Sequence, residues 1–325
     1  MDVAVIGLGL IGGSALRALA AGGHRVTGYD ADPATRTAAR AAADDPAGAR
    51  WRVADTVAEA VSGAGLVLLA VPLPALPAVL DEVAGAGCAG LLTDVTSVKG
   101  PVRDLVRQRF TGRNFVGGHP MAGRETSGFA ASDPRLFDGC AWVLCLEEGA
   151  TDLRHWLDLA GLVTSLGARV VPATAADHDR AVAAVSHVPH LLAAALTTAA
   201  AGDPLAGTLA AGSFRDGTRV AASPPGLIAA MCGGNAAAVG RALDAALETL
   251  AAMHAALDAP DPVSALRPLV APASAARNAW PATPGPRTEA PARMDVLLDL
   301  GRSGGWVVAV SEDRATVVTV RPSAG

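Results

Sequence analysis

The opening stretch of the chain places the strictest limit on its fold. Residues 2–6 are an apolar run, typical of a central parallel strand covered on both faces. A G-x-G-x-x-G pattern follows at once, and we expect an alanine-rich helix after it to about residue 21. Such glycines allow a tight turn, close approach of the backbone to a pyrophosphate, and close packing of helix on sheet. The stretch therefore predicts an α/β fold built on a Rossmann-type, doubly wound parallel sheet.

A second predicted strand, residues 25–29, ends at an aspartate that suits NAD. An acidic side chain at this point hydrogen-bonds the adenosine ribose and repels a 2′-phosphate, so NAD is favoured over NADP. The helix amino terminus behind the glycines presents N–H groups to the phosphates. A glycine turn used only for packing is the alternative. Two further candidates, Val71 and Pro72, lie at the end of a buried strand. We therefore expect NAD to be bound by Gly7, Gly9, Leu10, Ile11, Gly12, Asp30, Val71 and Pro72.

The pattern of strands and helices continues to residue 172, with further apolar runs at 140–146 and 168–171. We expect residues 1–172 to form the NAD-binding domain. From 173 to 258 the pattern is helix after helix, with Ala and Leu on several faces. Helices with so many apolar residues bury their apolar faces against other parts of a protein, and a second subunit is a natural partner. This half is expected to be a helical substrate and dimerisation domain of a homodimer.

The carboxy-terminal part changes character twice. Residues 259–291 are rich in Pro and Ala and indicate a linker or an irregular wrap. Residues 292–325 contain three short apolar runs, at 294–300, 305–310 and 316–320, which we interpret as strands of a β-rich extension. So few residues cannot easily hold a core alone, so this extension should pack on the body or on a partner.

His119 is the candidate base. It lies within GGHPMAG at 117–123, just after a short apolar run, so we expect it on a loop stiffened by Pro120 at the mouth of a sheet. A histidine there can take up a proton near neutral pH. An isolated histidine would more often be a surface-loop residue. The dinucleotide site before it and an arginine after it favour the base.

Two polar residues follow the predicted strand at 90–94. Strand ends line the ligand crevice of an open α/β sheet. Ser97 is therefore expected to meet the nicotinamide or the substrate, or else to cap the helix that runs to about Arg109. Both interpretations stay open, and one side chain could serve both. Lys99, the only lysine in the chain, is expected to be solvated in the first turn of that helix.

The helical half offers an anion holder. Arg219 could grip a substrate carboxylate, since a guanidinium makes two parallel hydrogen bonds and stays charged. A surface arginine is the alternative. His187 and His190 are three apart and could share one helix face. Their alternatives are packing at a helix amino terminus or a metal site, and a metal is disfavoured because no carboxylate lies at suitable spacing. His178 and Asp179 could support His187 or Arg219.

Composition excludes several other classes. The net charge of −5 disfavours nucleic acid, which would want a basic face. No apolar run lasts the roughly 18 residues of a membrane span, and a first strand at Asp2 leaves no room for a secretory signal. Four cysteines without a CxxC pair or metal-type spacing indicate buried thiols in a reducing compartment. We expect a cytoplasmic protein that acts on a small molecule, without nucleic-acid or membrane partners.

Several motifs, in order from about residue 2 to 257, together resemble the prephenate dehydrogenase family of tyrosine biosynthesis. They are GLGLIGGS at 7–14, DVTSVKG at 94–100, GHPMAG at 118–123, Glu125 with Ser127 and Gly128, SHVPH at 186–190 and FRDGTR at 214–219.

The resemblance implies oxidative decarboxylation of prephenate to 4-hydroxyphenylpyruvate with NAD. It implies that His119 deprotonates the C4 hydroxyl and that Ser97 orients both His119 and this hydroxyl. Arg219 would bind a substrate carboxylate and His190 would line the pocket. His187, with Asp179, would belong to a supporting ionic network.

One departure from the family concerns Arg124, where many members carry threonine. Arg124 either binds the pyruvyl carboxylate of the substrate or faces solvent. The residues after 291 are too few for the regulatory ACT domain found in many members, which leaves control by tyrosine through such a domain in doubt. Arogenate stays open as the substrate.

Two other functions share features of this sequence. A hydroxy-acid dehydrogenase of the 3-hydroxyisobutyrate type shares the two-domain plan but uses a lysine from the helical half, which this chain lacks. A non-enzymatic NAD-binding scaffold would bind the nucleotide without turnover.

Overall fold

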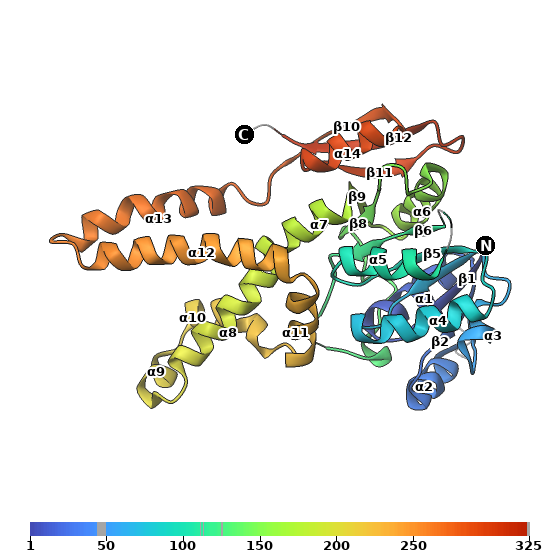
Figure 1. The fold of residues 1–325 in the computed structure, drawn as a ribbon, viewed down its shortest axis with the longest axis horizontal. Helices are drawn as coiled ribbons and strands as arrows, with labels where there is room; N and C mark the ends of the chain where they lie inside the picture. The colour runs from blue at the N-terminus through green and yellow to red at the C-terminus, as the bar shows by residue number, and fades with distance from the viewer. Residues whose placement is uncertain (44–49, 111, 113, 125, 324–325) are drawn as a thin grey trace. The chain divides into compact units, whose positions relative to one another are not determined.

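The computed structural model describes residues 1–43, 50–110, 112, 114–124 and 126–323, and it divides into two compact units (Figure 1). Unit 1 is Met1–His178 together with Pro286–Arg321, and unit 2 is Asp179–Gly285 together with the last residues from Pro322. The boundary thus falls six residues beyond the expected one at 172, inside a helix. The carboxy-terminal extension belongs to unit 1.

The first sheet of unit 1 is parallel throughout and has the strand order β3-β2-β1-β4-β5-β6 of a Rossmann fold. Val3 and Val5 of its central strand belong to one buried core, whereas Ala4 and Ile6 belong to a second. Two cores form because successive side chains of a strand point to opposite faces. The doubly wound parallel sheet is confirmed. Its strands are β1 (Asp2–Ile6), β2 (Arg25–Tyr29), β3 (Arg52–Val53), β4 (Leu66–Leu69), β5 (Leu91–Asp94) and β6 (Phe115–Val116).

Helices connect these strands and supply the rest of the two cores. They are α1 (Leu10–Ala21), α2 (Pro33–Ala43), α3 (Val57–Val61), η1 (Leu73–Ala75), α4 (Leu76–Gly85) and α5 (Gly100–Arg109).

A second sheet in unit 1 has the order β10-β12-β11-β9-β8-β7. Strands β8 and β9 are parallel, whereas β7 with β8, β9 with β11, and β11 with β12 are antiparallel. The runs at 140–146 and 168–171 therefore form strands, as expected, but in this second sheet. The elements of this part are β7 (Gly118–Pro120), η2 (Phe129–Ala131), β8 (Ala141–Cys145), α6 (Leu153–Ser165), β9 (Arg169–Ala173), β10 (Pro284–Pro291), α14 (Met294–Arg302), β11 (Trp306–Val310) and β12 (Thr316–Pro322).

The prediction of a strand at 294–300, the first of the three expected in the carboxy-terminal extension, is wrong. Residues 294–302 are the helix α14, which buries Leu297, Leu298 and Leu300. Met294, Leu297 and Leu298 have the i, i+3, i+4 spacing of one helix face, and this spacing decides against a strand. The other two expected strands are confirmed as β11 and β12, and β11 pairs with β9 of the body.

Unit 2 is helical. The prediction of a linker at 259–291 is wrong, because most of this stretch is regular secondary structure. Helix α13 begins after Asp261, whose carboxylate accepts the Ser264 N–H at 3.1 Å. The helix contains Pro268 and Pro272. These prolines suggested an irregular segment. The helices are α7 (Ala175–Val182), which begins in unit 1, the π-helical turn η3 (Ala183–His187), α8 (Val188–Ala200), α9 (Pro204–Leu209), α10 (Gly212–Thr218), η4 (Arg219–Ala222), α11 (Pro225–Gly234), α12 (Ala236–Leu257) and α13 (Pro262–Asn278).

The continuous helix 175–200 is, by length and composition alone, apolar enough to cross a membrane, a test that core helices of water-soluble proteins also pass. All four cysteines are free thiols, but only Cys145 is fully buried. Burial raises the pKa of the Cys140 thiol to about 11 and also raises that of Cys232. Both thiols therefore stay protonated and unreactive near neutral pH.

Candidate active site

The glycine loop between β1 and α1 has the shape of a phosphate cradle. Gly7 has a φ of +95°, and a Cβ there would lie 2.4 Å from the Ala70 carbonyl oxygen. A Cβ on Gly12 would lie 1.8 Å from the Gly7 carbonyl oxygen, so neither position accepts a side chain. A Cβ on Gly9 would meet no atom within 4 Å, which leaves that side of the loop open.

The first turn of α1 suits an anion. The helix begins at Leu10 and Ile11, and among the described residues no side chain caps it and no acidic residue lies in its first turn. Its amino-terminal N–H groups and dipole face the open side of the loop. At the end of β4 the half-buried Val71 lies beside this loop, with its Cγ1 3.0 Å from the position of a Cβ on Gly7, and Pro72 is exposed.

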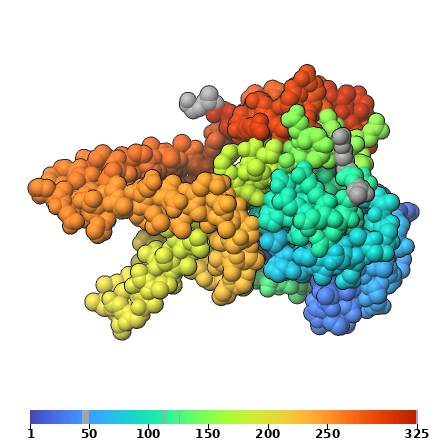
Figure 2. Space-filling model, in the orientation of Figure 1, coloured from blue at the N-terminus to red at the C-terminus, as the bar shows by residue number. Residues whose placement is uncertain are grey.

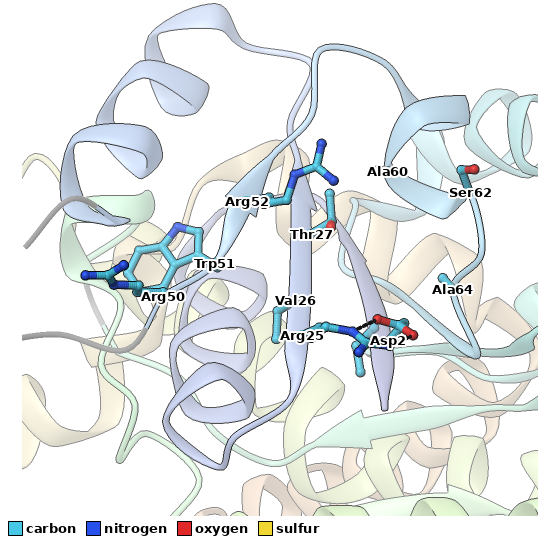
Figure 3. Close-up of a pocket in the computed structure, with 11 residues that line it drawn as sticks. Asp2, Arg25, Val26, Thr27, Arg50, Trp51, Arg52, Ala60, Ser62 and Ala64 are labelled. Atoms are coloured by element: carbon cyan, nitrogen blue, oxygen red, sulfur yellow. Dashed lines mark hydrogen bonds and ion pairs between the residues drawn. The ribbon is translucent and has the colours of Figure 1, made fainter.

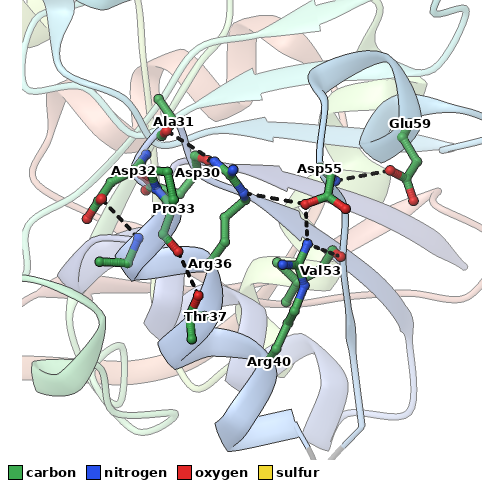
Figure 4. A network of polar contacts seen from close by, with 11 residues as sticks. Asp30, Ala31, Asp32, Pro33, Arg36, Thr37, Arg40, Val53, Asp55 and Glu59 are labelled. Carbon is green, nitrogen blue, oxygen red and sulfur yellow. Dashed lines mark hydrogen bonds and ion pairs between the residues drawn. The ribbon is translucent and has the colours of Figure 1, made fainter.

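Asp30 occupies its expected place at the end of β2. Its Oδ2 accepts the Leu8 N–H at 2.7 Å. Its Oδ1 accepts the Asp32 N–H at 2.9 Å, and both aspartates are drawn in Figure 4. The guanidinium of Arg36 donates to the carbonyls of Asp30 and Ala31 at 2.8 and 3.1 Å. The carboxylate is thus fixed against the glycine loop, where a ribose hydroxyl of NAD would be recognised. The residues of this cradle fit the cofactor.

A buried ion pair joins Asp94, the last residue of β5, to Lys99, and this pair was not predicted from the sequence. Lys99 is 1% exposed and Asp94 is 0% exposed, and their ammonium and carboxylate are paired. Asp94 also accepts the N–H groups of Thr96 at 3.0 Å and Gly118 at 3.1 Å. Lys99 donates to the Gly118 carbonyl at 2.6 Å and to the Thr96 hydroxyl at 3.1 Å. Both polar groups of Gly118 are therefore held to the end of β5.

This network corrects two expectations. Lys99 is not solvated, because three partners replace the water that an ammonium loses on burial. Ser97 is not the helix cap, since α5 begins at Gly100 with Lys99 as its N-cap residue. Ser97 is half-buried in the turn between β5 and α5, at the carboxyl edge of the parallel sheet.

His119 lies on a strand, not on the expected loop. β7 pairs antiparallel with β8, so that His119 is opposite Val143. Its neighbour Gly118 is bound to Asp94, the last residue of β5, which places β7 beside the carboxyl edge where open α/β sheets bind ligands. The half-buried ring lies with its Nδ1 2.8 Å from Nε2 of His178, which is 2% exposed. The sequence predicts that His178 supports His187 or Arg219, whereas the structure pairs it with His119.

Arg124 lies in the segment after β7. Its Nη2 is 2.7 Å from a carboxylate oxygen of Asp133, and both residues line a cavity of about 600 Å³. The Arg135 N–H, and then the Arg124 guanidinium, hold the pKa of Asp133 below its usual range. The Asp133 N–H donates to the Ser14 hydroxyl of α1 at 2.9 Å, which docks the segment on this helix. Glu125 lies outside the described residues.

A second cavity, of about 510 Å³, opens at the opposite edge of the parallel sheet (Figure 3). Asp2, Arg25 and Arg52 line it, from the amino-terminal ends of β1, β2 and β3. Because ligands of open α/β sheets bind at the carboxyl ends of strands, we assign this cavity no part in the site.

In unit 2 the expected residues lie in different environments. His187 is 0% exposed, and its Nδ1 is 3.3 Å from the amide nitrogen of Asn235, which also donates to the Asp179 carbonyl at 2.7 Å. His187 and Asp179 are thus linked through Asn235, a residue the sequence did not single out. The half-buried His190 donates from Nδ1 to the Ser186 carbonyl at 2.8 Å, which leaves its Nε2 as an acceptor. Arg219 is exposed on η4, which packs against α8.

These features define a class, a Rossmann-type nucleotide-binding protein with a helical second unit. The profile described as the nucleotide-binding domain of prephenate dehydrogenase matches residues 13–172, and that of its dimerization domain matches residues 174–266. The chain belongs to the prephenate dehydrogenase family.

Individual relatives agree with this assignment. The prephenate dehydrogenase of Bacillus subtilis is 35% identical over 69% of this chain and 62% of its own length. The cyclohexadienyl dehydrogenase of Zymomonas mobilis is 35% identical over 69% of this chain and 78% of its own length. The crystal structure of Aquifex aeolicus prephenate dehydrogenase with hydroxyphenyl propionate and NAD+ is 26% identical, covers 86% of this chain and 97% of its own, and has a TM-score of 0.75. The chain spans less than two thirds of the B. subtilis protein.

Proposed function

We propose that this chain is an NAD-dependent prephenate dehydrogenase, which oxidatively decarboxylates prephenate to 4-hydroxyphenylpyruvate. The observation that carries the proposal is the His119–His178 pair, fixed through Gly118 to the carboxyl edge of a Rossmann sheet. A base at that edge is what the oxidation of a substrate hydroxyl requires.

Each residue of the site has an assigned role in the proposed reaction. The residues Gly7, Gly9, Leu10, Ile11, Gly12, Asp30, Val71 and Pro72 hold NAD, which supplies the hydride acceptor when bound. Nε2 of His119 takes the proton of the C4 hydroxyl, and Ser97 orients that hydroxyl. Loss of the ring carboxylate as CO2 then yields an aromatic ring, which makes the reaction irreversible in practice.

The carboxylates of prephenate need cationic partners in a chain of net charge −5. We assign Arg219 to one of them, with His190 beside it on the neighbouring helix. Arg124 is assigned to the pyruvyl carboxylate, for which it would exchange the carboxylate of Asp133. His187 is fully buried, so we assign it a supporting part through Asn235 and not direct contact with substrate.

Arogenate is the alternative substrate, since it differs from prephenate only by an amino group in place of the keto group. The name of the Z. mobilis relative, cyclohexadienyl dehydrogenase, leaves that alternative open. The 3-hydroxyisobutyrate-type reaction is disfavoured, because the only lysine of this chain is buried in unit 1. We further propose a cytoplasmic homodimer assembled through unit 2.

The test is a steady-state assay of NADH formation with prephenate and with arogenate, each with NAD and with NADP. His119→Asn is expected to lower kcat about 10²–10⁴-fold with little change in NAD affinity, the usual range for loss of a general base. Near-normal turnover of His119→Asn would reject the assignment. Nucleotide binding without turnover of either substrate would instead favour an NAD-binding scaffold.

A further inference from the structure

His119 and His178 share one proton between two rings. Nδ1 of His119 and Nε2 of His178 are 2.8 Å apart, and the ring planes are inclined at 73°. Two ring nitrogens at this distance hold a single hydrogen between them, so one imidazole donates and the other accepts. The direction of this hydrogen bond decides the tautomer of both neutral rings.

Only one direction leaves His119 able to act as a base. If His178 donates from Nε2, the single proton of neutral His119 must sit on its Nε2, and that nitrogen can accept nothing. If His119 donates from Nδ1, its Nε2 carries a lone pair and can take a proton. His178 must then be neutral, with its own proton on Nδ1.

We propose that His178 is a positioning residue that holds His119 in the tautomer with the proton on Nδ1 and Nε2 unprotonated. This inference rests on the proposed function, in which His119 is the base. When His119 accepts the substrate proton it becomes an imidazolium, and its hydrogen bond to His178 becomes charge-assisted and stronger. His178 therefore stabilises the protonated product of the transfer more than the starting state, which is the condition for raising kcat.

The backbone around His119 supports this assignment. Gly118 is held by the Asp94 carboxylate and the Lys99 ammonium, and Pro120 restricts the backbone of the residue before it, His119. The main chain of His119 is thus fixed independently of His178. These backbone contacts do not set the tautomer of the ring, whereas the 2.8 Å contact with a buried imidazole acts on the ring itself.

Two substitutions separate positioning from packing. His178→Leu keeps an apolar side chain of similar volume but removes the acceptor, and we expect kcat to fall about 10- to 100-fold, the range for one hydrogen bond to a charged group. His178→Gln places an amide oxygen near the position of Nε2, and we expect it to restore kcat to within a few-fold of wild type. The KM for NAD should stay unchanged in both. His24→Leu, in the turn between α1 and β2, is the matched control.

Nitrogen-15 NMR of histidine-labelled protein reads the tautomer without an assay. The chain has seven histidines, and the His119 signals are assigned by their loss in His119→Asn. We expect a protonated Nδ1 and an unprotonated Nε2 for His119 in wild type and in His178→Gln, and a shift toward the opposite tautomer in His178→Leu.

The outcomes distinguish this inference from the proposed function. Turnover by His119→Asn would reject the base itself. If His119→Asn is inactive while His178→Leu turns over normally, or if the leucine and glutamine variants are equally impaired, His178 has no positioning role. A wild-type His119 protonated on Nε2 in the neutral state would overturn the inference directly.

Discussion

Unit 1 buries large side chains from many of its own elements, among them Trp156 and Phe137, each fully inaccessible to solvent. In unit 2 the corresponding buried cluster consists of Ala183, Val188, Ala238 and Val239. The same chain thus contains one unit with a closed apolar core and one in which most apolar side chains remain exposed. Stability of a helical unit comes mainly from packing of its apolar faces, so unit 2 is expected to gain much of its stability from a partner.

The surface of α12 shows what such a partner would cover. Leu247, Leu250 and Leu257 are 49–57% exposed and recur at helical spacing on one face. All three leucines belong to α12, which packs against α13, and both helices are orange in Figures 1 and 2. The contrast suggests a division of labour, in which unit 1 holds the reacting groups rigidly and unit 2 joins two copies of the chain.

Lys99→Met tests the rigidity of unit 1 and should have the largest effect on stability. The substitution leaves the Asp94 carboxylate buried at 0% exposure without its ammonium, and breaking a buried pair in this way costs about 3–5 kcal/mol. Urea unfolding monitored by circular dichroism measures the loss. We also expect a lower kcat, because the Gly118 carbonyl loses its donor.

The double variant Asp94→Asn with Lys99→Met is the control for that experiment. It removes both charges, and an asparagine can still accept the Gly118 N–H, so most of the lost stability should return. A double variant as unstable as Lys99→Met would mean that packing, and not the unpaired charge, causes the loss.

Replacing both Leu247 and Leu250 by glutamate tests unit 2. Burial of one leucine contributes about 1.5–3 kcal/mol, so a dimer that covers both should dissociate at least ~100-fold more readily. Sedimentation velocity across a concentration series measures this change, and Glu248→Gln on the same helix is the control. A dimer of unchanged affinity would place the interface on another face.

Arg219→Ala tests whether the exposed unit contributes to ligand binding. We expect the KM for prephenate to rise about 10- to 100-fold with a smaller change in kcat, because a charge-assisted pair of hydrogen bonds to a carboxylate is lost. Arg215→Ala, also exposed and four residues earlier, controls for general loss of positive charge. An unaltered KM in Arg219→Ala would assign the carboxylate to another group.

In both units some elements were predicted from the sequence better than others. Local patterns with strong physical causes were predicted well: the glycine loop requires residues without a Cβ, and Asp30 follows directly from the end of β2. The long helix α12 lies within the stretch 173–258 that was expected to be helical, since its apolar periodicity is sustained. Where prolines or short runs gave mixed signals, as in α13 and α14, the prediction failed.

The contacts of the site residues were harder to predict, because their partners are distant in sequence. Lys99 and Gly118, or His119 and His178, meet only through the pairing of β5, β7 and α7 with their neighbours, which no spacing rule encodes. One signal was available, since a single lysine in a chain with many arginines is a candidate for a specific partner. The sequence thus located His119 but not what holds it.

Asp30→Ser is expected to have the smallest effect of these substitutions, and it tests unit 1 alone. Removal of the carboxylate abolishes both its repulsion of a 2′-phosphate and one hydrogen bond to the ribose, so the ratio of kcat/KM for NADP to that for NAD should rise about 10-fold. The carboxylate also accepts the Leu8 N–H, and a serine hydroxyl is too short to keep that bond at 2.7 Å. The glycine loop should therefore bind both nucleotides somewhat more weakly. Thr37→Ala, one turn into α2, is the matched control. If the variant loses NAD affinity without any gain in NADP affinity, Asp30 maintains the shape of the glycine loop and does not select the cofactor. In either case we expect the dimer affinity, which depends on unit 2, to stay unchanged.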